Sequence, residues 1–600
     1  EGKKYCSTGQ VRVSPSHELV AFTVDFSGDE TCELQVKNVA TGEIVDHDEK
    51  LECDGTVVWG NDDSTLFYLK MDDAHRPFAV YRHKIGGSRT NDDEDELLYQ
   101  EDDELYWVRA WRSFDRRYLF VSSKSKETAE IHFLDLTDPD AKLQCIARRR
   151  PKVLYSATHR EGRWLITTNV GGTPNMRLVT CPAVADTEDL WEDAVDQDGK
   201  KMFDGGYGRS LDGVTPFASH LVASGREGGI PRVWVASFES EKGTGVTDFS
   251  RLTFDEMAYD VGLSGNLEYN TDQVVLGYDS LVTPLQSIRV NMSDVTDRTV
   301  LKEKKVPDYD RSLFGCERTT ALSRDGTTEI PVSIVYRKDV MEKIRSGKME
   351  GGAHVHLYGY GSYNACIEAS FRSSRLPLLE RGMIYVIAHV RGGGEMGRQW
   401  YEEPNGAKYL CKQNTFNDFV DVARWLCEDR KLTSPKKLSC EGRSAGGLLI
   451  GASVNQAPEL FKAAILGVPF VDVVCTMIDA RIPLTVVEWE EWGNPNEKKF
   501  FDYMMQYSPI NNVKNGATYP SCLLTGGLHD PRVQYWEPSK FAAELRHRQG
   551  PESGPVCVKI DMSAGHFSAS DRYKYLKELA FDYAFLLDQL GLASVSPEGK

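Results

Sequence analysis

One short stretch of the chain could carry nucleophilic chemistry. In EGRSAGG (441–447), Ser444 lies between Gly442 and Gly446. The residues before it, KKLSCE (436–441), are typical of a short buried strand, and LLIGASVNQA (448–457) is typical of a helix. A serine at such a strand-to-helix reversal is exposed on a strained turn, for which flanking glycines leave room. The pattern predicts that Ser444 is a catalytic nucleophile; the alternative is a structural glycine-rich turn.

A serine nucleophile needs a base to take its proton and a carboxylate to orient that base. In α/β-hydrolases both follow the serine in the chain, on loops after strands at the same edge of the sheet. His566 lies in a small-residue loop directly after the strand VCVKID (556–561), and Asp530 ends the strand and glycine loop LLTGGLHD. Asp472 comes too early and Asp561 lies inside the strand before the histidine. We therefore predict His566 as the base and Asp530 as its partner.

Acyl transfer also needs donors placed for the oxyanion. The backbone N–H of Ala445, immediately after the nucleophile, is the first candidate. The second must come from a loop after an earlier strand, and LYGYGSY (357–363) offers the phenolic O–H of Tyr360. A tyrosine in a glycine-rich loop is equally consistent with a lid or packing role, so the residues alone leave this open.

The elements around these residues predict an α/β domain over 304–600. Near-continuous apolar strands at 328–337, 353–361, 383–390, 463–470 and 521–527 alternate with helices at 414–430, 537–549 and 571–591. Such strands are buried on both faces. The sequence predicts an α/β-hydrolase domain with a mostly parallel, doubly wound sheet.

The first half, 1–303, follows a different pattern. Short alternating strands recur in pairs whose first members start at 20, 66, 119, 165, 221 and 274. A period of about 50 residues with several short strands per unit is typical of a β-propeller blade. We predict a propeller with six visible units; the alternative is an irregular β-sandwich, which needs no period.

Composition excludes several other classes of protein. The formal charge of −19 disfavours nucleic acid and anionic membranes as partners. The apolar stretches are far shorter than the ~20 residues that a membrane span requires. The 13 cysteines include no C-x-x-C pair, so no zinc ribbon is predicted, and their scatter fits a cytoplasmic location. We expect no metal and no cofactor, and the sequence predicts no oligomeric state.

Taken together, the motifs resemble the prolyl oligopeptidase family of serine peptidases. They are YGYGSY (358–363), RGGGE (391–395), GRSAGG (442–447), the loop that begins Asp530-Pro-Arg532, and AGH (564–566), in that order behind a propeller. The segment 468–495 narrows the resemblance, which covers nearly the whole chain, to the oligopeptidase B branch. The resemblance implies Ser444, Asp530 and His566 as the triad and Tyr360 with the Ala445 N–H as the oxyanion hole. It also implies Arg532 as a substrate anchor and Tyr363 as part of the substrate pocket.

The resemblance also bears on specificity and completeness. Prolyl-specific members have an apolar primary pocket, whereas oligopeptidase B cleaves short peptides after Lys or Arg and uses carboxylates, which match Glu488 and Glu490 here. Glu491 is expected on a solvated helix face. The family has seven blades and a preceding N-terminal segment, so we expect that segment and part of the first blade to lie outside this sequence.

Three alternatives stay open. They are a prolyl-specific oligopeptidase, a propeller-based peptide-binding protein with an inactive hydrolase domain, and a lipase or esterase. The last is disfavoured because no H-G-G-G-type loop precedes the serine.

Overall fold

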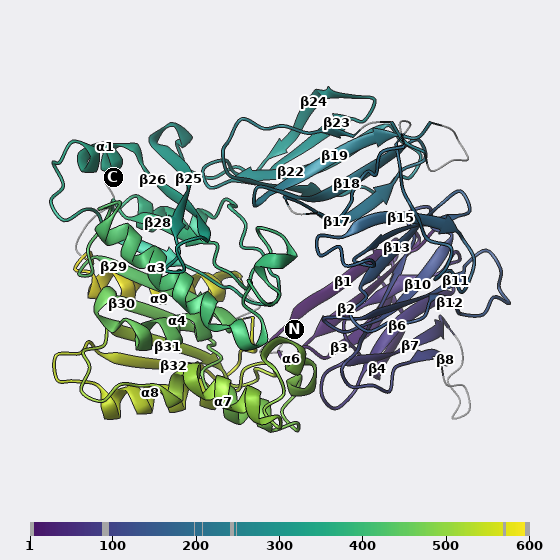
Figure 1. Ribbon diagram of the computed structural model, residues 1–600. Coiled ribbons are helices and arrows are strands. Elements are labelled where there is room, and N and C mark those ends of the chain that lie inside the picture. Colours follow the sequence, from purple (N-terminus) through teal and green to yellow (C-terminus); the bar gives the residue numbers. More distant parts are fainter. Residues whose placement is uncertain are drawn as a thin grey trace.

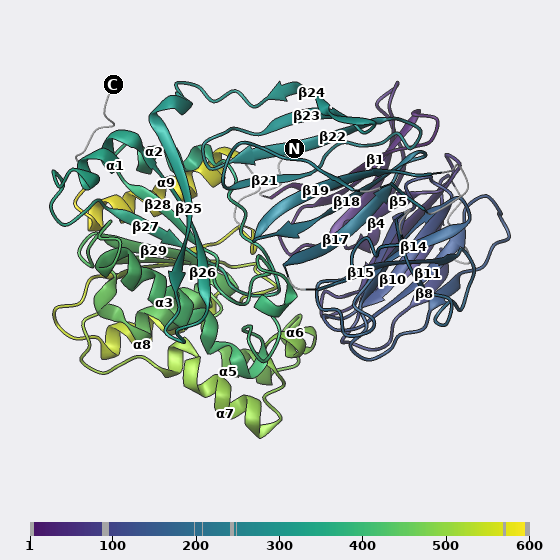
Figure 2. The ribbon, with the colours of Figure 1, turned by 45° about the horizontal axis from the view of Figure 1, so that its top comes forward.

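A computed structural model describes residues 5–86, 95–196, 199–206, 208–239, 245–247, 249–567 and 572–593. The first half of the chain forms a set of small sheets, and the second half forms a helix-covered sheet beside it (Figure 1). The same two bodies stay side by side when the molecule is turned (Figure 2). The two-domain architecture predicted from the sequence is confirmed.

The described residues of the first half form six antiparallel four-stranded sheets, each built from consecutive strands. The seventh blade implied by the resemblance is not among them. In the first of these sheets, β1 is a strand that the repeat predicted from the sequence did not include. That strand, STGQVRV, is largely exposed and only weakly apolar, so its sequence gives little signal. The strands, four to a sheet, are β1 (Ser7–Val13), β2 (Leu19–Asp25), β3 (Cys32–Asn38), β4 (Ile44–Cys53); β5 (Val57–Trp59), β6 (Thr65–Met71), β7 (Pro77–Lys84), β8 (Glu96–Gln100); β9 (Trp107–Arg112), β10 (Tyr118–Lys124), β11 (Ala129–Asp135), β12 (Gln144–Ala147); β13 (Tyr155–Arg160), β14 (Arg163–Thr168), β15 (Arg177–Pro182), β16 (Glu192–Asp193); β17 (Arg209–Pro216), β18 (His220–Glu227), β19 (Ile230–Ser237), β20 (Ser250–Arg251); β21 (Tyr259–Leu263), β22 (Gln273–Ser280), β23 (Gln286–Asn291) and β24 (Asp294–Glu303).

Consecutive sheets pack face to face through separate apolar clusters. Alternate side chains of a strand point to opposite faces of its sheet. In β14, Trp164 and Ile166 pack toward the third sheet, whereas Leu165 packs toward the fifth. Similar clusters join the first sheet to the second, the second to the third and the fifth to the sixth. The alternating residues from which the repeat was predicted therefore also supply the apolar side chains that pack between neighbouring blades.

The second half is built on one eight-stranded sheet in the order β25-β26-β28-β27-β29-β30-β31-β32. Its first three strands pair antiparallel and the rest pair parallel. Apolar clusters cover both faces, with α3, α4 and α8 on one side and α2 and α9 on the other. The predicted doubly wound sheet is confirmed, with bounds β25 (Phe314–Leu322), β26 (Glu329–Arg337), β27 (Val355–Tyr358), β28 (Ile384–Ala388), β29 (Leu438–Arg443), β30 (Ala463–Gly467), β31 (Ser521–Gly527), β32 (Val556–Asp561), α1 (Lys338–Arg345), α2 (Leu376–Leu379), α3 (Gln413–Glu428), α4 (Ala445–Gln456), α5 (Val473–Ile478), α6 (Thr485–Trp492), α7 (Lys498–Tyr507), α8 (Trp536–Arg548) and α9 (Arg572–Gln589).

Candidate active site

Ser444 occupies a strained turn between β29 and α4. Its backbone has φ 57° and ψ −121°, outside the regions that L-residues usually adopt. The strain is held by close packing, because a Cβ placed on Gly442 would lie 2.2 Å from the carbonyl oxygen of Gly446. A Cβ on Gly446 would in turn lie 2.9 Å from the carbonyl oxygen of Gly359. Both flanking glycines are therefore required to seat the serine against the loop after β27.

The predicted base and its carboxylate meet at the same edge of the sheet. His566 Nδ1 lies 2.7 Å from Asp530 Oδ2, and the side chain of Asp530 is fully buried. Its other oxygen, Oδ1, accepts hydrogen bonds from the backbone N–H groups of Arg532 at 2.8 Å and Val533 at 2.9 Å. The carboxylate is thus fixed on one side by the backbone and on the other by the imidazole. This arrangement orients the histidine for proton transfer.

The two predicted oxyanion donors approach Ser444 from different elements. Ala445 begins α4, so its N–H belongs to the unpaired first turn of that helix. Tyr360 follows β27 and lines the same cavity as Ser444 and His566. Burial, with the charge of Glu488 adding to it, raises the pKa of the Tyr360 phenol. The phenol therefore stays protonated and able to donate a hydrogen bond.

Replacing Tyr360 with Phe is expected to lower kcat about 100-fold with little change in KM, because the lost donor acts on charge that develops only in the transition state. Steady-state kinetics on a chromogenic amide substrate measure both constants. A variant in which KM rises and kcat is unchanged would instead assign Tyr360 a lid or packing role.

A cavity of about 510 Å³ opens in front of these residues. The cavity extends from the predicted catalytic groups to a wall of apolar and charged residues. That wall is formed by α5, α6 and the loops after β27 and β31. The lining side chains include Tyr360, Tyr363, Ser444, Phe470, Met477, Glu488, Trp492, Arg532, Val533, His566 and Phe567.

Glu488, on α6, presents a partly buried carboxylate to this cavity. Its Oε2 accepts hydrogen bonds from the Tyr363 hydroxyl at 2.8 Å and from Trp492 Nε1 at 2.9 Å. The Tyr363 backbone has a positive φ of 64°, which turns the end of its loop toward α6. The structure therefore brings the predicted pocket residues Glu488 and Tyr363 into direct contact.

The two neighbouring glutamates differ from expectation. Glu490 does not line the cavity; its Oε2 accepts a hydrogen bond from the backbone N–H of Lys126 at 2.8 Å. The prediction that it binds substrate is not supported by this placement, because successive positions on a helix point in different directions. The prediction for Glu491 is wrong. Its side chain is fully buried, and it accepts hydrogen bonds from the Tyr363 N–H at 2.9 Å and from the Tyr401 hydroxyl.

Lys412 is a positioning residue that the sequence did not reveal. It is buried just before α3, and its Nζ donates to the Gly361 carbonyl at 2.6 Å and to the Ser362 hydroxyl at 2.8 Å. Burial lowers the pKa of Lys412 to about 8, and the charge of Glu491 opposes this shift. Lys412 and Glu491 both hold the loop of Tyr360 and Tyr363, through Gly361, Ser362 and the Tyr363 N–H. A lone lysine before a helix carries no sequence signal for this role.

Arg532, the predicted substrate anchor, reaches the propeller. Its Nε and Nη2 bind the two carboxylate oxygens of Glu30 at 2.8 and 2.7 Å. Glu30 lies in the turn between β2 and β3 of the first blade. The bidentate pair fixes the guanidinium at the cavity wall from the opposite domain.

Glu537 buttresses the segment between β30 and α5 that forms one wall of the cavity. It is fully buried, and it accepts hydrogen bonds from the N–H groups of Val471 at 2.7 Å and Asp472 at 2.9 Å and from the Thr476 hydroxyl at 2.7 Å. Burial raises the pKa of Glu537 from 4.5 to about 7, with Asp472 adding to the shift. The stability that this group contributes is fully present below pH 4.5 and is lost as the pH rises through 7.

Replacing Glu537 with Gln is therefore expected to make stability less sensitive to pH. Between pH 5 and pH 8, the wild type should lose roughly 2–3 kcal/mol relative to the variant. Thermal unfolding of both proteins across this range measures the difference. Glu544→Gln, on the same helix but paired with Arg548 at the surface, is the control. Parallel curves for the wild type and Glu537→Gln would contradict the assignment.

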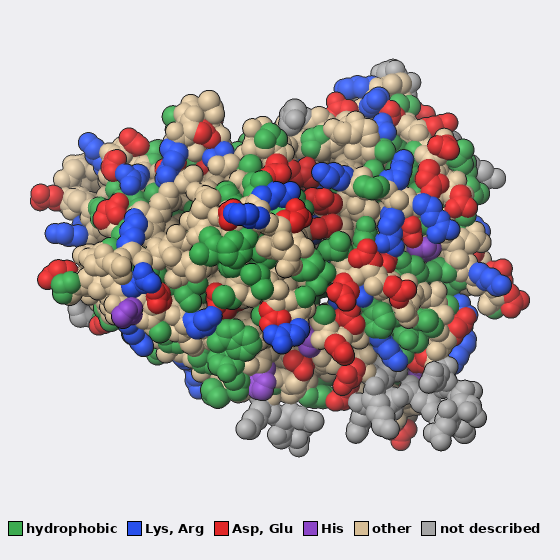
Figure 3. Space-filling view, turned by 60° about the horizontal axis from the view of Figure 1, so that its bottom comes forward, with side chains coloured by type: hydrophobic (Ala, Val, Ile, Leu, Met, Phe, Trp, Pro, Cys, Tyr) green, Lys and Arg blue, Asp and Glu red, His purple; other side chains and the backbone are tan. Residues whose placement is uncertain are grey.

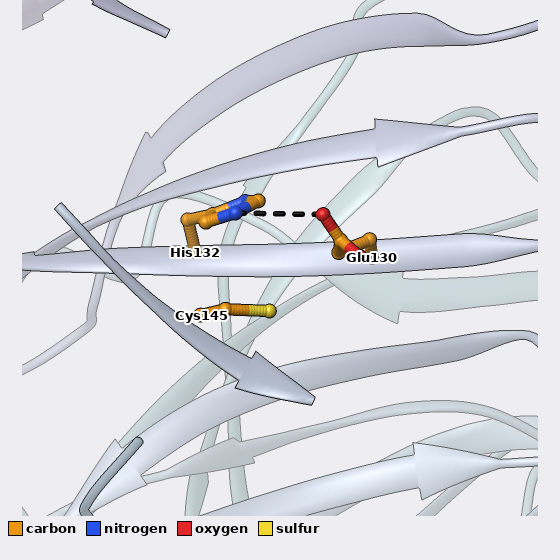
Figure 4. Close-up of side chains that lie close together, drawn as sticks. All are labelled: Glu130, His132 and Cys145. Carbon is orange, nitrogen blue, oxygen red and sulfur yellow. Dashed lines mark ion pairs between the residues drawn. The ribbon is translucent and has the colours of Figure 1, made fainter. Parts of the chain in front are cut away.

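One cluster of possible metal ligands occurs in the described ranges, in the third blade (Figure 4). The ligand atoms of Glu130, His132 and Cys145 lie within 4.8 Å of one another. Burial raises the pKa of the Cys145 thiol to about 12, and burial also lowers the pKa of His132. Glu130 already accepts a hydrogen bond from the backbone N–H of Arg149 at 2.9 Å. A protonated thiol next to arginine side chains is poorly suited to a cation, so we interpret the cluster as a buried polar contact.

Figure 3 shows acidic side chains spread over both halves of one face, with Lys and Arg between them. The acidic surplus is therefore distributed rather than gathered into a single patch on this face. Among the helices that the structure describes, none is long and apolar enough to cross a membrane.

Comparison with known proteins covers almost the whole chain. Residues 1–304 match the N-terminal β-propeller domain of prolyl oligopeptidase, and residues 369–593 match the prolyl oligopeptidase family. Protease 2 of Moraxella lacunata is 36% identical over 99% of this chain and 81% of its own, and dipeptidyl aminopeptidase BI of Pseudoxanthomonas mexicana is 37% identical over 99% and 78%. Oligopeptidase B from Leishmania major superposes with a TM-score of 0.90 at 38% identity, covering 99% of this chain and 80% of that one. Oligopeptidase B from Trypanosoma brucei with covalently bound antipain, in a closed form, gives 0.89 at 40% identity, covering 98% and 80%. Because both its propeller and its hydrolase domain match, the chain belongs to the prolyl oligopeptidase family.

Proposed function

We propose that this protein is a serine oligopeptidase that cleaves short peptides on the carboxyl side of Arg and Lys. The observation that carries the proposal is the Glu488 carboxylate, which lines the same cavity as Ser444 and His566. A partly buried carboxylate beside aromatic rings suits a basic side chain, because charge-assisted hydrogen bonds and cation–π contacts add together. The similarity to oligopeptidase B structures supports the same assignment.

The reaction follows from the placement of the groups. His566 takes the proton of Ser444 as Oγ attacks the peptide carbonyl, and Asp530 stabilises the resulting imidazolium. The oxyanion is stabilised by the Tyr360 hydroxyl and the Ala445 N–H. His566 then gives its proton to the leaving amine, which departs and leaves an acyl-enzyme. Water, deprotonated by the same imidazole, releases the acid product and restores the serine.

The position of the propeller next to the cavity supports a restriction to short peptide substrates. Its turns contact the cavity wall directly, through Glu30 on Arg532 and through Lys126 on Glu488. We propose that these contacts keep folded proteins from Ser444 and that a flexible peptide is admitted when the two domains separate.

The function is tested by comparing amide substrates that end in Arg, Lys or Pro, together with labelling by a small fluorophosphonate. We expect labelling at Ser444 and faster turnover of the Arg and Lys substrates. Faster turnover of the Pro substrate would favour a prolyl-specific enzyme. Absence of labelling would favour a peptide-binding protein with an inactive hydrolase domain.

We also propose a cytoplasmic location. Twelve of the 13 cysteines, Cys32 to Cys557, are free thiols, and several are buried within blades or within the hydrolase sheet. Free thiols at this number fit a reducing compartment. Fractionation of source cells with antibodies to this chain tests the location, and recovery from the medium would contradict it.

A further inference from the structure

A turn of the propeller reaches the proposed specificity pocket. The hairpin between β10 and β11 carries Lys126 at its tip, and α6 of the hydrolase domain projects toward the propeller (Figure 1). Lys126 Nζ lies 2.9 Å from Glu488 Oε1 and 3.3 Å from the Val487 carbonyl oxygen. It also lies 4.8 Å from the centre of the Tyr363 ring.

Two of these three partners, Glu488 and Tyr363, also line the cavity and are therefore open to the basic side chain of a substrate. A carboxylate oxygen, a carbonyl oxygen and an aromatic ring together make a site for one ammonium or guanidinium group. Because Oε2 of Glu488 is already taken by Tyr363 and Trp492, Oε1 is the oxygen left for a cation. In this structure, Lys126 holds that oxygen.

We propose that Lys126 determines the affinity and specificity of the pocket as an internal competitor for Glu488. The inference rests on the proposed function, since it assumes that Glu488 receives the basic side chain of the substrate. A second cation at the same carboxylate would be repelled by the first, so an Arg or Lys substrate must displace the Lys126 ammonium. A neutral side chain gains nothing from that displacement and is selected against.

The turn is built so that the side chain can leave while its backbone stays docked. The Lys126 N–H donates to Glu490, and its carbonyl accepts from Arg398 Nη2 at 3.1 Å. The next residue, Glu127, binds Lys408 Nζ at 2.7 Å and the Tyr409 hydroxyl at 2.9 Å. None of these contacts uses the Lys126 ammonium. Its side chain is 24% exposed, so a displaced ammonium can enter solvent without undocking the hairpin.

The test compares Lys126→Met with wild type, using benzamidine as a monocationic probe of the pocket. We expect the inhibition constant for benzamidine, and KM for an Arg amide, to fall roughly tenfold in Lys126→Met. The rate of labelling by a small neutral fluorophosphonate should not change. Lys126→Arg keeps the charge and should stay near wild type. Glu127→Gln weakens the adjacent domain contact without touching Glu488 and should leave the inhibition constant unchanged.

An inhibition constant that is unchanged or raised in a Lys126→Met protein with a normal melting curve would overturn the inference. Equal falls in Lys126→Met and Glu127→Gln would also overturn it, because the cause would then be domain loosening. The proposed function fails in a different way. A wild-type protein that is labelled at Ser444 but neither binds benzamidine nor cleaves Arg amides would overturn both.

Discussion

Replacing Asp530 with Asn is expected to lower kcat about 10⁴-fold while the protein stays folded. The amide oxygen of Asn can still accept the backbone N–H groups of Arg532 and Val533, which fix Oδ1 in the wild type. Its NH₂ group would then face His566 Nδ1 and select the tautomer that carries its proton on Nε2. That tautomer cannot take the proton of Ser444. The measurement is kcat on an Arg amide.

Asp561 provides the matched control for this substitution. It ends β32 at the same edge of the sheet, but it pairs with Ser563 and Lys574. Asp561→Asn should keep kcat within a few-fold of wild type. Comparable losses in the two variants, or more than a tenth of wild-type activity in Asp530→Asn, would contradict the assignment of the triad.

The parts of the site that were predictable lie where local pattern and topology agree. Ser444 could be located because a buried strand, two glycines and a helix follow one another in the sequence. His566 and Asp530 could be located because each follows a parallel strand, and the ends of such strands meet at one edge. The propeller could be predicted because its blades repeat the same alternation.

The contacts between the domains could not be predicted in the same way. Glu30 and Arg532 are separated by 502 residues, and Lys126 and Glu488 by 362. Neither pair produces a recognisable pattern in the sequence, because each partner is an ordinary charged residue in its own segment. Only the docking of the two domains decides which charges meet. The prediction for Glu491 failed for a related reason. Its carboxylate is buried against hydrogen-bond donors of Tyr363 and Tyr401, which lie in two distant loops.

The residues that line the cavity all belong to the hydrolase domain, and these contacts bring charged groups of the propeller against two of them. The hydrolase domain carries the predicted nucleophile, base and pocket carboxylate, whereas the propeller carries the charges that pair with Arg532 and Glu488. Both charged groups that would hold a substrate are therefore paired before it arrives. On the proposed function, a basic substrate must displace Lys126 from Glu488, which links occupation of the cavity to this one contact between the domains.

Replacing Glu488 with Gln tests the charge that the hydrolase domain contributes to the contact with Lys126. The amide keeps the size of the side chain and an oxygen for Tyr363 and Trp492, but it removes the negative charge. We expect kcat/KM for Arg amides to fall about 10²–10³-fold, since a buried charge pair is lost from both the bound substrate and the transition state. Labelling of Ser444 by a small fluorophosphonate should be largely unaffected. Equal losses in both assays would mean that Glu488 supports the fold of the site.

The neighbour Glu490 gives the control, because its carboxylate accepts the backbone N–H of Lys126 and Gln can keep that bond. Glu490→Gln should therefore change kcat/KM only a few-fold. The double variant Glu488→Gln/Lys126→Met then tests whether the two residues act as one unit. Once the carboxylate is gone, Lys126 has nothing to compete for, so its removal should no longer strengthen benzamidine binding. The effects of the two substitutions should thus be non-additive, as expected for groups in direct contact. Additive effects would mean that Lys126 and Glu488 act on the substrate independently.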